Sequence, residues 1–162
     1  SSKALLNNKK GIEVKTFKLI DICLKEGFPD LIRMDVEGHE TKILENLFSN
    51  YKKFKKLPKI CFETHISKYN KKNSMKKILK RLFSIGYKVK FASSSSTRGS
   101  NILEKKFFYK PILKAIKTDE EIRKIYIDIK NKDAIKIICE TGGLRTILLS
   151  AKRWNIVVTQ KT

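Results

Sequence analysis

Two short apolar runs, each followed by a segment with helical periodicity, most strongly restrict the folds open to this chain. DLIRMDV (residues 30–36) and KICFET (residues 59–64) are almost continuously apolar, as are strands in a parallel sheet that is covered on both faces. Residues 40–51 and 73–86 then place their apolar side chains on one helical face. Strands that alternate with helices in this way predict an α/β fold with a mostly parallel sheet.

The remaining segments extend this order of elements along one domain, residues 1–162, of which residues 1–11 are expected to be loose. Further predictions are a strand at 12–17, a helix at 18–27, a strand at 87–92, a polar loop at 93–100, a helix from Thr118 to Ile129, and a terminal hairpin at 134–154 that turns at Gly142 and Gly143. The hairpin would add an antiparallel terminal strand to the sheet.

The net charge of +21 leaves two interpretations open. A field this positive attracts nucleic acid or an anionic surface, so a non-catalytic lysine-rich binding module is the alternative to an enzyme. However, 31 of the 37 basic residues are lysine and only 6 are arginine, and the lysines are spread over the whole chain. Phosphate and base-edge recognition favours arginine. A bias toward the A/T-rich codons of Lys, Ile and Asn explains the charge equally well, so nucleic-acid binding is possible but not favoured.

Three widely spaced cysteines, Cys23, Cys61 and Cys139, form no CxxC pair and are odd in number. This pattern predicts reduced thiols and a cytoplasmic location. No apolar run approaches the roughly 20 residues of a transmembrane helix.

Titratable side chains gather where the two apolar runs end. Asp35 and Glu37 close the first run, and Glu63 and His65 close the second. Ligands of open α/β sheets bind beyond the carboxyl ends of the strands, so these four side chains would meet at one edge if the strands are neighbours. A histidine or carboxylate at such an edge can act as a general base toward an incoming nucleophile.

Simpler interpretations of these residues are also open. An acidic residue after a strand is a favourable helix start, which would account for Glu37 or Glu40, and His39 would then lie on a solvated first turn. Glu63 could pair with one of the many lysines. A metal site is conceivable as well, because carboxylates and imidazoles bind divalent ions. Its candidate ligands are Asp35, Glu37, Glu63, His39 and His65, but their spacing matches no sharp ligand motif, and we expect no metal.

A longer motif surrounds these residues. TFKLIDICLKEGFPDLIRMDVEGHETKILENL (residues 16–47) is followed by ICFETH (residues 60–65). The pattern resembles the FkbM-type methyltransferases, whose sequences carry a TLDDL-like stretch, a basic residue before DVEG, a Glu and an apolar pair, and an E-x-H strand downstream. The positions in register are Thr16, Asp35, Val36, Glu37, Gly38, Glu40, Leu44, Glu63 and His65. Arg33 takes the basic position, where the family more often has Lys, and the resemblance extends over about residues 12–91.

The resemblance implies a Rossmann-like domain that uses S-adenosylmethionine to methylate a hydroxyl, often on a sugar or secondary metabolite. Carried over by position, Asp35, Glu37, Glu63 and His65 would be catalytic. Arg33 and His39, in the same motif, would bind the acceptor. We expect His65 or Asp35 to orient and deprotonate the acceptor hydroxyl, with catalysis mostly from positioning.

The glycine-rich turn that such a cofactor needs after the first strand has no counterpart near the N-terminus. The glycines are Gly11, Gly27, Gly38, Gly86, Gly99, Gly142 and Gly143. The cofactor-binding residues therefore stay unidentified. We expect the chain to be the C-terminal half of a methyltransferase, an incomplete half of the full fold that keeps the substrate-side residues.

Overall fold

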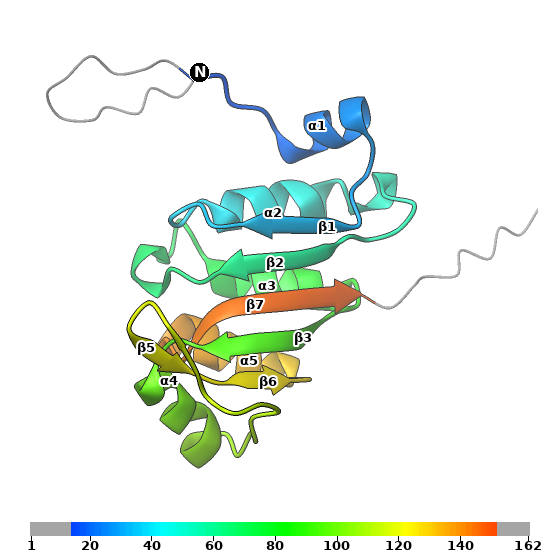
Figure 1. Ribbon diagram of the computed structural model, residues 1–162. Coiled ribbons are helices and arrows are strands. Elements are labelled where there is room, and N and C mark those ends of the chain that lie inside the picture. Colours follow the sequence, from blue (N-terminus) through cyan, green and yellow to red (C-terminus); the bar gives the residue numbers. More distant parts are fainter. Residues whose placement is uncertain (1–13, 152–162) are drawn as a thin grey trace, which may run out of the picture.

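A computed structural model describes residues 14–151, which form a five-stranded sheet with helices along one face (Figure 1). The strand order is β1-β2-β7-β3-β6. The strands are β1 (Leu31–Met34), β2 (Lys59–Glu63), β3 (Tyr87–Ser94), β6 (Ile125–Ile127) and β7 (Leu144–Ala151). A separate hairpin joins β4 (Ile116–Thr118) and β5 (Glu121–Arg123). The predicted α/β class is confirmed in this mixed form.

The sheet is less parallel than predicted. β1 and β2 are parallel, but β7 runs antiparallel to both β2 and β3, and β6 runs antiparallel to β3. The cause is the last strand, which inserts between β2 and β3 in the opposite direction. Along its length it exchanges backbone hydrogen bonds with both neighbours, so the antiparallel strand lies inside the sheet.

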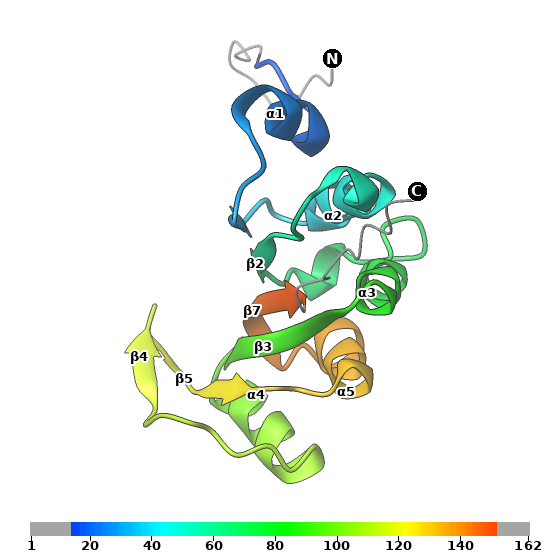
Figure 2. The ribbon, with the colours of Figure 1, turned by 90° about the vertical axis from the view of Figure 1, so that its right-hand side faces the viewer.

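The helices α1 (Leu19–Glu26), α2 (Glu40–Ser49) and α3 (Met75–Ser84) form where their periodicity predicts them. The side chain of Ser74 caps α3 by accepting a hydrogen bond from the Lys77 amide. Seen along the sheet, α2, α3 and α5 (Asn131–Lys136) lie on the same side (Figure 2). Their apolar side chains pack on the sheet in one core. Its fully buried members include Leu44, Leu47, Leu79, Leu82, Ile60, Phe62, Val89, Ile137, Ile147 and Leu149.

The predicted helix from Thr118 to Ile129 is wrong. The segment instead holds the end of β4, then β5 and β6, because Asp119 and Glu120 adopt positive φ angles of 49° and 64° and close a tight turn. Thr118 and Glu121, which have the spacing of a helix capping box, pair with each other across this hairpin. The predicted strand at 12–17 is also wrong for residues 14–17, which are exposed and have no regular structure, and residues 12 and 13 lie outside the described range.

The prediction of a terminal hairpin is confirmed for its second strand and wrong for its first. Its second strand is β7, but its first half is helical and consists of α5 and the π-helical turn η4 (Ile137–Thr141). Gly142, in the left-handed region at φ 67°, ends this helix before β7. Residues 152–154 lie outside the described range, as does the segment 1–11 that was expected to be loose.

The predicted polar loop at 93–100 is partly regular. β3 continues to Ser94, and α4 (Thr97–Asn101) leads into the π-helical turn η3 (Ile102–Lys106). Two short 3₁₀ turns, η1 (Tyr51–Lys53) and η2 (Ile66–Lys68), complete the elements of residues 14–151. All three cysteines are free thiols. Within the described range, no helix has the length and apolar character needed to cross a membrane.

Candidate active site

The turn after β1 brings the DVEG motif to the edge of the sheet where β1 and β2 both end. Glu37 and Gly38 have positive φ angles of 51° and 99°, which reverse the chain sharply before α2 begins. A Cβ at Gly38 would lie 2.5 Å from the Cβ of Lys68, so only glycine allows this turn to pack against the loop after β2.

Glu40, the first residue of α2, holds this turn in place. Its side chain is completely buried. Oε1 accepts hydrogen bonds from the backbone amides of Val36 and Gly38, both at 3.3 Å, and lies 2.9 Å from Nδ1 of His65. Oε2 has no hydrogen-bond partner among the described residues. One buried carboxylate therefore fixes both the backbone of the motif and the imidazole opposite it.

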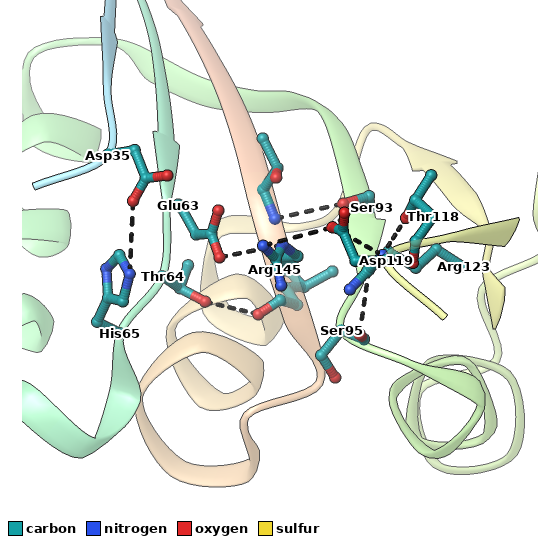
Figure 3. A network of polar contacts seen from close by, with 12 residues as sticks. Asp35, Glu63, Thr64, His65, Ser93, Ser95, Thr118, Asp119, Arg123 and Arg145 are labelled. Carbon is teal, nitrogen blue, oxygen red and sulfur yellow. Dashed lines mark hydrogen bonds and ion pairs between the residues drawn. The ribbon is translucent and has the colours of Figure 1, made fainter. Parts of the chain in front are cut away.

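His65 follows β2 and faces the turn. Because Oε1 of Glu40 is a hydrogen-bond acceptor, Nδ1 of His65 is the donor of this contact, and Nε2 is the ring nitrogen that faces Asp35 and Glu37. Nε2 lies 3.6 Å from Oδ1 of Asp35 and 3.6 Å from Oε1 of Glu37. The imidazole is 13% exposed, whereas the Asp35 and Glu37 side chains are 44% and 78% exposed. The contact between His65 and Asp35 is drawn in Figure 3. We call Asp35, Glu37, Glu40 and His65 the His65 group.

The structure thus brings together three of the four side chains that the sequence assigned to one edge. The fourth, Glu63, does not join them. Its Oε1 lies 3.0 Å from Nε of Arg145 on β7, and Arg145 also contacts Asp119 at 3.7 Å (Figure 3). Asp119 in turn lies 3.6 Å from Nη1 of the buried Arg123. We call Glu63, Asp119, Arg123 and Arg145 the Arg145 group.

The amino-acid sequence matches the Methyltransferase FkbM domain over residues 1–89. The chain belongs to the FkbM methyltransferase family. No curated protein and no solved structure matched it. The matched residues include the whole His65 group, whereas Arg145, Asp119 and Arg123 lie beyond the match.

The two predicted acceptor-binding residues of this FkbM domain lie outside the His65 group. His39 is exposed at the residue before α2, on the solvated turn that the sequence allowed. Arg33 is exposed on β1, in register with Cys61 of β2. Neither side chain has a hydrogen bond or ion pair within residues 14–151, so both are free to contact a ligand.

Two residues outside the predicted site, Tyr69 and Asn73, support it. The Tyr69 hydroxyl accepts a hydrogen bond from the His65 amide at 3.0 Å, and burial raises the pKa of this phenol far above its ordinary value, which keeps it protonated. Asn73 joins three segments. Its Nδ2 donates to the carbonyls of Gly38 and Lys68, both at 3.0 Å, and its Oδ1 accepts from the Thr41 hydroxyl. No local pattern marks either residue, because their partners lie in other segments.

Asp35, Glu37 and His65 also form a possible set of metal ligands. One ligand atom from each lies within 4.8 Å of the others. Two carboxylate oxygens and an imidazole nitrogen are a donor set that suits divalent ions. Occupation by a metal would use the lone pair of Nε2, so His65 cannot be a metal ligand and a free base at the same time.

The described residues do not provide the glycine-rich cradle that S-adenosylmethionine, the cofactor implied by the family, would need. Gly38 packs against Lys68, and a Cβ at Gly99 would meet the Gly143 carbonyl oxygen at 2.5 Å. Both close approaches are to the protein itself. The donor site is therefore not assigned to any residue between 14 and 151.

The cysteines do not offer a nucleophile for covalent catalysis. Burial raises the pKa of the Cys139 thiol to about 11, and burial also raises the pKa of Cys23 and Cys61. At neutral pH all three are thiols, which are weak nucleophiles.

Proposed function

We propose that this FkbM domain methylates a hydroxyl group of a sugar or secondary metabolite, with S-adenosylmethionine as methyl donor and a Rossmann-like arrangement of the complete site. The single observation that carries the proposal is His65, held at Nδ1 by Glu40 and flanked at Nε2 by Asp35 and Glu37. The family match supports methyl transfer in general. No comparison favours the alternative of a lysine-rich binding module.

In this mechanism, Nε2 of His65 accepts the proton of the acceptor hydroxyl. The resulting oxygen nucleophile is the species that methyl transfer requires. Asp35 and Glu37 stabilise the imidazolium that forms, because two negative charges close to Nε2 favour its protonated state. Glu40 selects the tautomer in which Nε2 is the base, the role that a buried carboxylate plays in catalytic triads. S-adenosylmethionine, when bound, supplies the electrophilic methyl group.

Parallel pairing supports the Rossmann-like part of the proposal. β1, α2 and β2 form a parallel β-α-β unit, and α3 leads from β2 to β3, which runs in the same direction. The His65 group lies just after the carboxyl ends of β1 and β2, where open α/β sheets bind ligands.

The test compares Asp35→Asn and His65→Asn with the wild type in an assay of S-adenosylhomocysteine formation over a panel of sugars, sugar phosphates and polyketide alcohols. Loss of a general base lowers the rate by about 10²- to 10⁴-fold, and we expect a loss in that range for His65→Asn. Asp128→Asn is the matched control, because Asp128 is an exposed aspartate paired with Lys90 at the end of β6. Full activity of either site variant would refute the assignment.

The assay is repeated with a chelator, because the same three residues could hold an ion. Activity that persists supports His65 as the base. Activity that disappears and returns with Mg²⁺ would assign Asp35, Glu37 and His65 as metal ligands, with the metal lowering the pKa of the acceptor hydroxyl instead.

A further inference from the structure

A polar pocket of about 480 Å³ adjoins the His65 group, between α2, α3 and the loop after β2. Its size is in the range of small-molecule sites, which is about 300–1,000 Å³. Most such sites are lined by apolar side chains, but this one is lined mainly by polar and charged residues. Glu37 belongs to both the pocket and the His65 group, so the two adjoin each other at this side chain.

Five lysines line the pocket against two glutamates. The lysines are Lys42, Lys68, Lys71, Lys72 and Lys77. The second glutamate, Glu45, is already neutralised by Arg81 at 2.7 Å. The lysines that do form ion pairs within residues 14–151 are others, namely Lys25, Lys56, Lys76, Lys90 and Lys124. The pocket therefore holds an excess of positive charge that the described part of the protein does not balance.

The walls of the pocket are fixed by hydrogen bonds. Asn73 ties the turn at Gly38 to the loop at Lys68, and the Thr41 hydroxyl holds Asn73 from α2. The amino end of α3 also borders the pocket, and its first turn contains no acidic residue. A helix amino end favours an anion, so it adds to the field of the lysines.

We propose that this pocket binds the phosphate group of the acceptor, so that the substrate is a phosphate ester or a diphosphate-linked sugar whose free hydroxyl faces His65. This inference rests on the proposed function, since it names the class of molecule that the His65 group deprotonates. Lysine ammonium groups and a helix amino end are the groups that hold phosphate elsewhere in proteins. The neutral hydroxyl end of the ligand meets Asp35 and Glu37, and the charged end meets the lysines.

The test measures binding by isothermal titration calorimetry with inorganic pyrophosphate, glucose 1-phosphate and glucose as probes, in the absence of any methyl donor. The pocket variant is Lys71→Glu/Lys72→Glu. The matched control is Lys52→Glu/Lys53→Glu, two adjacent exposed lysines in η1 that change the net charge equally but do not line the pocket. Circular dichroism confirms the fold of both, since all four side chains are exposed.

We expect both phosphate probes to bind, glucose not to bind, and the pocket variant to weaken phosphate binding by at least about tenfold, with a change of less than about twofold in the control. Equal losses in the two variants would show a general effect of net charge and overturn the proposal. Absence of phosphate binding, or a short oligonucleotide that binds more tightly and is weakened equally by both variants, would overturn it as well.

The phosphate site and the proposed function can be refuted independently of each other. His65→Asn should keep its affinity for glucose 1-phosphate, because His65 is not one of the residues that line the pocket. Full methyl transfer by His65→Asn would refute the proposed function and leave the phosphate site standing. Methyl transfer to neutral hydroxyl acceptors alone, with phosphate esters acting only as competitors, would refute the assigned substrate class and leave the function intact.

Discussion

The His65 group and the Arg145 group each include a residue at the end of β2, namely His65 and Glu63 (Figure 3). The carboxylates of the first group contact a histidine, whereas those of the second contact arginines. Glu63 is 19% exposed and lies against the guanidinium of Arg145. Among the described residues, Asp35 and Glu37 contact no lysine or arginine, and their partner is the imidazole of His65, which is charged only when it is protonated. A carboxylate that is paired with arginine is committed to the structure, whereas one that faces a histidine can stabilise a change in protonation. Sequence position alone does not distinguish the two cases.

Of the substitutions that test this difference, Glu40→Ala is expected to have the largest effect on stability and on methyl transfer. The change leaves the amides of Val36 and Gly38 and Nδ1 of His65 without their acceptor, and each unpaired buried donor costs about 1–3 kcal/mol. We expect a loss of about 3 kcal/mol in the free energy of unfolding, measured by urea denaturation, together with a loss of methyl transfer.

Glu40→Gln is the control for this prediction, because its amide oxygen can still accept all three hydrogen bonds. It should recover most of the stability but not the full rate of methyl transfer, since a neutral amide beside Nδ1 stabilises an imidazolium less than a carboxylate does. A Glu40→Ala protein as stable as the wild type would show that the hydrogen bonds of Glu40 to Val36, Gly38 and His65 do not stabilise the His65 group.

A smaller effect is expected from the Arg145 group. A double-mutant cycle with Arg145→Gln and Glu63→Gln should give a coupling energy of about 0.5–1 kcal/mol, because the pair is partly exposed. Methyl transfer by Arg145→Gln should remain within about twofold of the wild type. If Glu63→Gln instead loses activity as severely as Asp35→Asn, Glu63 regains the catalytic role that the sequence predicted.

The smallest effect is expected from Glu104, a third carboxylate with fixed partners. Its pKa is lowered from 4.5 by the hydrogen bonds from Lys124 and Tyr126, at 2.9 and 2.7 Å. A lowered folded-state pKa stabilises the protein above pH 4.5, and the contribution is lost as the pH falls through the lowered value.

Glu104→Gln should therefore reduce the free energy of unfolding at pH 7 by only about 0.5 kcal/mol, since the pair is partly exposed. The difference from the wild type should disappear in urea titrations carried out well below pH 4.5. A difference that stays constant with pH would mean that Glu104 acts through packing, not through charge.

The sequence predicted most accurately where each element is determined by its own residues. β1 and β2 follow from apolar runs, and α2 and α3 follow from apolar side chains that share one helical face. The segment at 118–129 failed because its apolar spacing also fits short strands. β6 acquires its structure by pairing with β3, and this long-range contact overrides local preference. The turn at Asp119 and Glu120 has no glycine or asparagine that would have announced it.

The same limit applied to the site. Asp35, Glu37 and His65 could be placed together because parallel neighbouring strands end at one edge. The sequence allowed an ion pair between Glu63 and a lysine, but it did not identify the actual partner, Arg145, because the position of β7 beside β2 is not encoded near either residue. The sequence placed Glu40 in the same motif as Asp35 and Glu37, but it did not predict the contact with His65, because a favourable helix start explained a glutamate at this position equally well.

The backbone of Glu37 has a consequence for how this site would evolve. At a φ of 51° a residue with a side chain is strained by about 1 kcal/mol, which glycine would avoid. Selection for thermal stability alone would therefore replace Glu37 with glycine and remove a carboxylate from Nε2 of His65. A glutamate at this position has the opposite effect: the protein gives up some folding free energy and keeps a carboxylate beside Nε2 of His65, where we propose that a proton is transferred.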